Sequence, residues 1–401
     1  MKKKIAIVGG GACALILACE LDPQKFEVSV YEKNSALGRK FLVAGEGGLN
    51  LTYSENEANF ISRYTPSFFL ENAFSYFSNK GLVNWINELG VETYVGSSGR
   101  VFPKEGIKPI EVLNKILEKI KKNKTSLYTK IRLTDFSLKD GLVFESQVER
   151  KEVKSDVIIF CMGGASWPVT GSAGDWASLF KKNKIRVTPF QASNCSFNVD
   201  WGADKQSKIE GKVLKNISVS CGDKKLLGEI VMTHAGIEGS GIYPFSPEIR
   251  VQLQKNNKAE IAIDFKPDLS LEKIIEKIGM KPAGKNLTEH LKTHLHLGEG
   301  QIMLLKYFVS KEEFLNSNVL AQRIKEFKLT ITGTGPIEDA ISTVGGVALE
   351  EVDETFQLNN FPGHFVIGEM LDYDAPTGGY LLQSCFSMAK YLAHYLNAKN
   401  F

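Results

Sequence analysis

Ile5 to Ala14 read IAIVGGGACA, and this stretch decides the fold. Its apolar part, Ile5–Val8, predicts a strand that is buried on both faces of a parallel sheet. The following residues fit the pattern G-x-G-x-x-A, and a helical stretch continues to about Leu21. A second alternating strand, Phe26–Tyr31, ends at Glu32. Together these features predict a βαβ unit that binds the ADP part of a dinucleotide. A glycine turn without a ligand is the alternative.

Each position of the glycine turn has a physical task. Gly9 permits the tight turn out of the strand, and Gly11 leaves room for a pyrophosphate beside the backbone. Ala14 lets the helix pack closely on the strand, and the helix N-terminus from Ala12 offers free N–H groups and a positive dipole end to phosphates. Glu32 accepts hydrogen bonds from ribose hydroxyls, and its charge disfavours a 2′-phosphate. We therefore expect FAD or NAD at this turn rather than NADP.

Further along the chain, the pattern changes from helix to strand. An amphipathic helix is expected over Pro109–Lys122, followed by a hairpin over Ile131–Gln147 and a short strand near Glu152. A buried strand, Asp156–Phe160, then leads to Gly163-Gly164. A β-meander before such a strand is typical of two-dinucleotide-binding-type flavoproteins, in which this glycine pair passes close to FAD. An ordinary strand with a glycine turn is the alternative.

The C-terminal segment favours FAD over NAD. Phe365–Ile367 predicts a strand that ends in Gly368-Glu369, and Gly378-Gly379-Tyr380 precedes a closing helix from Leu381 to about Asn397. In FAD proteins of this architecture, an acid in the position of Glu369 binds the ribityl chain, and the closing helix points its N-terminus at the flavin ring. Negative charge gathers there on reduction, so the positive helix end raises the redox potential.

Composition excludes several classes of protein. The 401 residues predict two or three domains, and 49 Lys and Arg against 46 Asp and Glu give no bulk attraction for nucleic acid. The six cysteines form no C-x-x-C pair, which argues against disulfides and thiolate zinc sites and favours the cytoplasm. No apolar stretch reaches the ~18 residues of a membrane helix. Gly9–Gly11 interrupt the first apolar run, which argues against a secretory signal.

The histidine-rich segment at 290–296 does not predict a metal site. His290 and His294 share a helix face, but no Glu lies between them and no third ligand can be named. We expect a solvated helix face at this point, and no metal ion in the protein.

Several further motifs occur in a fixed order. They are Gly38–Leu42, Gly45–Asn50, Trp167–Pro168, Thr170–Ser172, Thr233–Gly239, Thr343–Val347, Gly368–Asp372 and Gly378–Gln383. With these motifs the chain resembles, over nearly its whole length, the BaiN/RdsA-type (YhiN-like) flavoproteins, a family of NAD(P)/FAD-dependent oxidoreductases. Many members have Arg-Cys-Asn where this chain has Gly48-Leu49-Asn50, so the chain represents a distinct branch.

The resemblance implies an α/β fold. It consists of a Rossmann-like FAD-binding domain of the two-dinucleotide-binding type, with an inserted β-rich domain and a small helical insert. We place the FAD-binding domain at 1–185 and 331–401, the β-rich domain at 186–267 and about 320–330, and the helical insert at 268–319. Short alternating runs at 215–220, 229–232 and 261–265 agree with the β-rich domain.

The resemblance also extends the expected cofactor site and gives it a function. The added cofactor-binding residues are Lys33, Gly38, Arg39, Lys40, Gly47, Gly48, Asn50 and Tyr380. The implied protein is an FAD-dependent oxidoreductase that reduces a C=C bond of a small unsaturated substrate with electrons from NAD(P)H. A flavin-dependent RNA-modifying enzyme that forms dihydrouridine is one alternative, and a non-catalytic FAD-binding module is the other.

Reduction of a C=C bond also requires a proton donor. His234 is the first candidate because it lies in a glycine-rich motif of the resemblance, although a hydrogen-bonded turn histidine is the alternative. Tyr380 is the second candidate because it adjoins the flavin end of the closing helix. The chain has no second G-x-G-x-x-G, so the sequence does not locate an NAD(P)H site.

Overall fold

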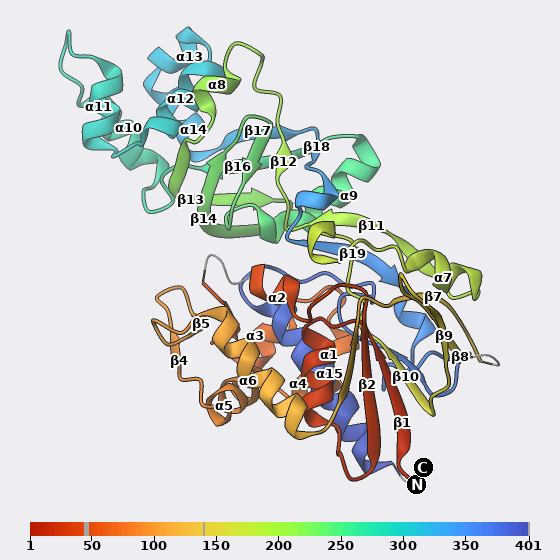
Figure 1. Cartoon of the computed structure of the whole chain (residues 1–401). Coiled ribbons are helices and arrows are strands. Elements are labelled where there is room, and N and C mark those ends of the chain that lie inside the picture. The colour runs from red at the N-terminus through yellow and green to blue at the C-terminus, as the bar shows by residue number, and fades with distance from the viewer. Residues whose placement is uncertain (44–47, 139–140, 400–401) are drawn as a thin grey trace. The chain divides into compact units, whose positions relative to one another are not determined.

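A computed structural model of the chain describes residues 1–43, 48–138 and 141–399 (Figure 1). The chain divides into two compact units. The first unit, Met1–Gln191 with Ile341–Phe401, unites both ends of the chain, and the second unit is Ala192–Ala340. The three-part division expected from the sequence stays a prediction.

The first unit is built on a five-stranded parallel sheet in the order β20-β10-β1-β2-β6. Residues 5–8 of β1 and all of β10, at the centre of the sheet, are apolar and buried because both faces of the sheet are covered there. The strands are β1 (Lys3–Val8), β2 (Phe26–Glu32), β6 (Ser126–Thr129), β10 (Val157–Phe160) and β20 (His364–Val366). The predicted βαβ unit and the later buried strands are confirmed.

Three helices come together beside this sheet. They are α1 (Ala12–Glu20), α6 (Pro109–Lys122) and α15 (Tyr380–Ala398). Helix α1 packs against both α6 and α15, so the first and last helices of the chain lie side by side (Figure 1). Residues 13–19 of α1 are all buried because neighbours surround the helix. The predicted boundaries of α6 are confirmed.

The connection from β6 to β10 is an antiparallel β-meander, β7-β8-β9. Its strands are β7 (Arg132–Ser137), β8 (Gly141–Glu145) and β9 (Arg150–Val153). The predicted hairpin and third strand are confirmed, while the turn residues Lys139 and Asp140 lie outside the described residues.

The remaining elements of the first unit are short. A three-stranded antiparallel sheet has the order β3-β5-β4, and β11 pairs with β19. The elements are α2 (Arg39–Val43), β3 (Thr52–Tyr53), α3 (Glu57–Ile61), α4 (Glu71–Tyr76), α5 (Asn79–Glu88), β4 (Thr93–Val95), β5 (Arg100–Pro103), α7 (Ala177–Lys182), β11 (Val187–Ser193) and β19 (Ser342–Val347).

The second unit contains a seven-stranded antiparallel sheet in the order β17-β16-β13-β14-β15-β12-β18. The predicted strand runs fall in β13, β14 and β16. The strands are β12 (Phe197–Asn198), β13 (Val213–Cys221), β14 (Lys224–Met232), β15 (Gly236–Glu238), β16 (Ala259–Asp264), β17 (Phe327–Ile331) and β18 (Gly333–Thr334). The helices are α8 (Gln206–Ile209), α9 (Ser246–Asn256), α10 (Leu271–Gly279), α11 (Leu287–His294), α12 (Glu299–Phe308), α13 (Lys311–Leu315) and α14 (Ser317–Lys325). Sheet and helices share one hydrophobic core.

The expected solvated face at the histidine-rich segment is wrong for one residue. His290 is buried, its Nε2 atom lies 2.7 Å from the carbonyl oxygen of Lys277, and its ring centroid lies 4.3 Å from that of His294 in a tilted arrangement. The i,i+4 spacing could not reveal this, because α11 contacts α10 through that face.

None of the described helices has both the length and the apolar character needed to span a lipid bilayer.

The carboxylate of Glu20 links the three packed helices of the first unit. It lies at the end of α1 and forms ion pairs of 2.7 Å with Lys119 of α6 and with Lys390 of α15. The indole Nε1 of Trp85 donates a third hydrogen bond to it. Burial raises the pKa of Glu20, but the two ammonium groups outweigh burial, and the pKa lies below its usual value.

We predict that E20Q lowers the free energy of unfolding by about 2–3 kcal/mol at pH 7, because two partly buried ammonium groups lose their counter-charge. A carboxylate with a lowered folded-state pKa stabilises the fold above its unfolded pKa, and this stabilisation is lost as the pH falls through the folded value. The difference between wild type and E20Q should therefore shrink below about pH 4.5. Urea denaturation of both proteins at pH 7 and at acidic pH measures this difference in the free energy of unfolding.

The matched control is E92Q, which breaks an exposed ion pair with Lys104. Its expected effect on the free energy of unfolding is much smaller than that of E20Q, because a solvent-exposed ion pair contributes little to stability. Equal effects of E20Q and E92Q at pH 7 would contradict the structural role of Glu20.

Candidate cofactor-binding site

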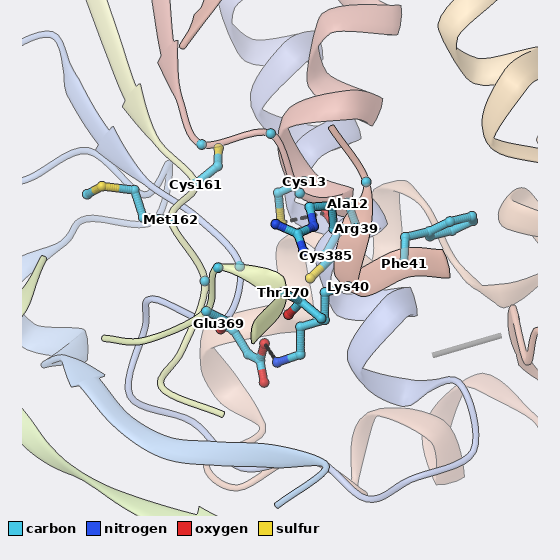
Figure 2. Close-up of a pocket in the computed structure, with 18 of the residues that line it drawn as sticks. Ala12, Cys13, Arg39, Lys40, Phe41, Cys161, Met162, Thr170, Glu369 and Cys385 are labelled. Carbon is cyan, nitrogen blue, oxygen red and sulfur yellow. Dashed lines mark hydrogen bonds and ion pairs between the residues drawn. The ribbon is translucent and has the colours of Figure 1, made fainter. Parts of the chain in front are cut away.

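A cavity of about 590 Å³ lies at the carboxyl ends of β1 and β10 (Figure 2). The strand order reverses between these two strands, and ligands of open α/β sheets bind at such a point. The volume lies within the range of small-molecule and cofactor sites. Val8–Cys13 from one end of the chain and Ile367–Glu369 with Pro376–Gly379 from the other end contribute to the lining.

The glycine turn after β1 forms one wall of the cavity. Gly9 has a φ of +103°, and a Cβ atom there would lie 2.3 Å from the carbonyl oxygen of Cys161, so only glycine fits. Gly11 has extended backbone, and a Cβ atom there would meet no described residue within 4 Å other than its chain neighbours. Gly11 is also the N-cap of α1 and has no side chain to bond the first N–H groups of the helix. These N–H groups can bind an anion in the cavity.

Glu32 closes the cavity at the end of β2. Its Oε2 atom accepts a hydrogen bond of 2.7 Å from the Gly10 amide, and its Oε1 atom accepts two of 2.7 Å from the amide and side chain of Asn34. A carboxylate offers about four acceptor positions, so about one is left for a ligand hydroxyl. The glycine turn therefore orients Glu32 for a ligand.

The N-terminus of α15 forms the opposite wall. Gly379 is the N-cap with a φ of +95°, and a Cβ atom there would lie 2.6 Å from the Cα atom of Thr52. Gly368, after β20, has a φ of +82°, and a Cβ atom there would lie 2.5 Å from the Cys13 sulfur. Both glycines are required because two chain segments pass close to each other. A second helix end without a side-chain cap thus meets the cavity.

Three polar atoms in the lining are buried without a hydrogen-bond partner among the described residues. They are Asn50 Oδ1, Ser172 Oγ and Glu369 Oε1. Such atoms cost free energy unless a partner is supplied. A ligand that carries hydroxyl or N–H groups along its length is therefore expected in the cavity.

Five basic side chains also line the cavity, and four of them have a partner. Lys40 donates to Glu369 Oε2 at 2.9 Å (Figure 2). It also donates to Ser166 Oγ at 3.0 Å. The other held cations are Lys33 and Arg132, which pair with Asp175 at 3.1 and 2.8 Å, and Arg39, which donates to Asn34 at 3.1 Å and to the Val169 carbonyl at 2.9 Å. Arg100 has no side-chain partner among the described residues.

Most of the cofactor-binding residues expected from the sequence are brought together. Those in the lining are Gly9, Gly11, Ala12, Glu32, Lys33, Gly38, Arg39, Lys40, Gly48, Asn50, Gly163, Gly368, Glu369, Gly378 and Gly379. Ala14 and Gly164 lie outside the lining: Ala14 is fully buried in the core, and a Cβ atom on Gly164 would lie 2.3 Å from Thr343 Oγ1. Gly47 lies outside the described residues.

Tyr380 is not part of the lining. Its hydroxyl donates to Glu55 Oε1 at 2.5 Å, and its ring packs against Tyr53 and Phe60. Burial, and then the Glu55 carboxylate, raise the pKa of the phenol well above its usual value. The sequence correctly placed Tyr380 at the N-terminal end of the closing helix. The direction of its side chain, however, is set by packing against neighbouring residues.

His234 belongs to the second unit, on the segment between β14 and β15. Its side chain is 61% exposed, and its Nδ1 atom lies 3.8 Å from a carboxylate oxygen of Glu210. The role of His234 as a proton donor stays a prediction.

Sequence reasoning missed three thiols in the lining, those of Cys13, Cys161 and Cys385 (Figure 2). Burial raises the pKa of Cys13 and Cys161 well above the usual value, so both are neutral thiols at pH 7. Cys13 occupies an x position of the glycine motif, which was the one available signal. Cys161 and Cys385 are distant in sequence, and only the fold brings them to the cavity.

The parallel sheet, the glycine turn and the two helix ends at one cavity define the class of Rossmann-type flavoprotein oxidoreductases. Within this class the chain belongs to the HI0933-like family, because the family model described as the HI0933-like protein Rossmann domain matches residues 3–395. Family membership confirms the resemblance found in the sequence and the α/β fold expected from it.

Two relatives cover nearly the whole chain. The ribosomal RNA dihydrouridine synthase of Haemophilus influenzae is 26% identical over 395 residues, 96% of each chain. The 3-dehydro-bile acid delta(4,6)-reductase of Clostridium scindens is 24% identical over 400 residues, 95% of each chain.

A solved structure shares the fold. It is the 3-ketosteroid delta1-dehydrogenase from Sterolibacterium denitrificans in complex with 1,4-androstadiene-3,17-dione, with a TM-score of 0.50 and 11% identity. The match covers 99% of this chain and 100% of that one.

We predict unequal stability effects for two substitutions in the glycine turn. G9A should lower the free energy of unfolding by at least about 2 kcal/mol, because a positive φ and a backbone contact oppose the new methyl group. G11A should change it by less than about 1 kcal/mol, because the methyl group meets open space. Thermal or urea denaturation measures both. Equal losses would show that Gly11 does not border a cavity.

Proposed function

We propose that the protein is an FAD-dependent oxidoreductase that reduces a C=C bond of a small unsaturated substrate with electrons from NAD(P)H. One observation carries the proposal: a single cavity joins the uncapped N-termini of α1 and α15 and contains three unpartnered polar atoms. A long ligand with an anionic middle and many hydroxyl groups fits such a lining. FAD has these properties, and when bound it supplies two-electron transfer chemistry.

In the proposed complex, the residues of the cavity would contact FAD from its adenosine end to its ribityl chain. Glu32 has an acceptor position left for the adenosine ribose, and the free N–H groups of α1 would hold the pyrophosphate. Glu369 Oε1, buried without a partner, would accept a hydrogen bond from the ribityl chain. Lys40 fixes the same carboxylate through its ion pair with Oε2.

The N-terminus of α15 would then face the flavin ring. Its positive dipole end favours negative charge at that place and so favours the reduced cofactor. Buried neutral thiols and Leu381 and Leu382 provide apolar surface in the same lining. Low polarity strengthens the electrostatic effect of the helix end.

Support for C=C reduction comes from the Clostridium scindens relative, whose name describes it as a reductase of a bile acid at delta(4,6) positions. The Haemophilus influenzae relative supports the alternative, an enzyme that forms dihydrouridine in RNA. Both reactions saturate a C=C bond, so the lining of the cavity does not distinguish a small-molecule reductase from an RNA-modifying enzyme. The net charge of +3 supports the small substrate, since binding RNA requires many basic contacts.

The test begins with the purified protein and its chromophore. We expect a yellow protein that releases FAD, and oxidation of NADH or NADPH under argon that depends on an added steroid enone. FAD without such oxidation, together with loss of dihydrouridine from ribosomal RNA in a deletion strain, would favour the RNA-modifying enzyme. FAD with neither activity would favour a non-catalytic module. A protein that stays colourless when offered FAD would overturn the proposal.

We predict that G11V weakens FAD binding by at least about tenfold, because the valine side chain occupies the space beside α1 that the pyrophosphate needs. The melting temperature of the FAD-free protein should change little. Fluorescence titration with FAD measures the affinity. G279V is the matched control: Gly279 also borders open space but lies in the second unit, and it should bind FAD like the wild type. Equal affinities of G11V and G279V would contradict the site.

A further inference from the structure

Arg100 is the cavity-lining cation that the proposed cofactor site leaves unexplained. Lys33, Arg39, Lys40 and Arg132 are each held by an acid or an oxygen of the protein. The guanidinium of Arg100 has no ion pair, hydrogen bond or ring contact with any other described residue. A half-buried cation without a partner in a cavity lined largely by apolar atoms is expected to have a ligand there.

The fold holds the backbone of Arg100 firmly. Arg100 is the first residue of β5, where it pairs with Tyr53 of β3. Its carbonyl accepts a hydrogen bond of 2.8 Å from the Gly96 amide, which closes the turn before β5. Gly99 has a φ of +82°, and a Cβ atom there would lie 2.9 Å from the Tyr53 ring. The tight turn and the strand pairing thus fix the backbone from which the Arg100 side chain extends.

The guanidinium lies at the α15 end of the cavity. A Cβ atom on Gly378 would lie 3.7 Å from Arg100 Nε, so the side chain borders the Gly378-Gly379 turn at the N-terminus of α15. The phosphate-binding turn lies at the other helix, α1. Arg100 is therefore placed for a group beside the proposed flavin ring and not for the pyrophosphate.

We propose that Arg100 binds the carbonyl oxygen of the substrate, and that the substrate is a conjugated carbonyl compound. This inference rests on the proposed function. In the overall reaction, NAD(P)H and one proton become NAD(P)⁺ while two hydrogens add across the C=C bond. When the electron pair arrives at the carbon distal to the carbonyl, negative charge develops on the carbonyl oxygen. A guanidinium at this place, with several N–H donors, stabilises that charge.

The test uses p-nitrophenol, because its phenolate oxygen carries delocalised negative charge like an enolate and because the phenolate absorbs visible light. FAD-loaded wild type should bind the probe and favour its phenolate form. R100M should bind it at least about tenfold more weakly and lose the preference for phenolate, while R100K should be intermediate. K104M is the matched control, because Lys104 forms an exposed ion pair just beyond β5, and it should behave like the wild type.

FAD affinity and thermal denaturation are measured for every variant. R100M with wild-type FAD affinity and weak probe binding supports the inference. If R100M does not fold, probe binding by R100K that is intermediate between none and that of the wild type supports it instead. Equal probe binding by R100M and wild type overturns the inference. A wild type that carries FAD but does not bind the probe also overturns it. Loss of FAD from folded R100M would assign Arg100 to the cofactor and would also overturn it. Failure of the proposed function shows separately, as a wild type that takes up no FAD.

Discussion

The packing of α1 against α15 is the contact on which the rest of the structure depends. These helices come from opposite ends of the chain, and Glu20 holds them together through Lys390 while it also binds Lys119 of α6. Because the helices lie side by side, their N-termini meet the same cavity at the carboxyl edge of the sheet. Without this contact each helix end would be an ordinary terminus with unbonded N–H groups.

The site adds close backbone contacts to this packing. Gly9 lies against the backbone of Cys161, Gly379 against the backbone of Thr52, and Gly368 against the side-chain sulfur of Cys13, each at a distance that excludes a Cβ atom. Because these positions are glycines, no side chain covers the neighbouring helix ends, and the helix N–H groups stay accessible to a ligand. The glycines therefore serve two purposes: they permit the crossing of the strands and helices, and they keep the cavity free.

Much of this could be predicted from the sequence because the local signals were strong. Apolar runs that end in glycine predicted the turns at Gly9, Gly11 and Gly368, the glycine pair before the closing helix predicted Gly379, and strand periodicity predicted the meander. Side-chain direction was harder. Tyr380 turns toward Glu55, and His290 is buried, because packing partners that are distant in sequence decide both. The lining thiols and Arg100 carried little local signal, since only the fold brings them to the cavity.

The decisive measurement is an experimental structure of the protein with bound FAD. We expect one FAD molecule in the cavity, with its pyrophosphate at the N-terminus of α1 and its ring at the N-terminus of α15. FAD bound elsewhere, or bound with only one of these helix ends in contact, would show that the two helix ends do not form one cofactor site.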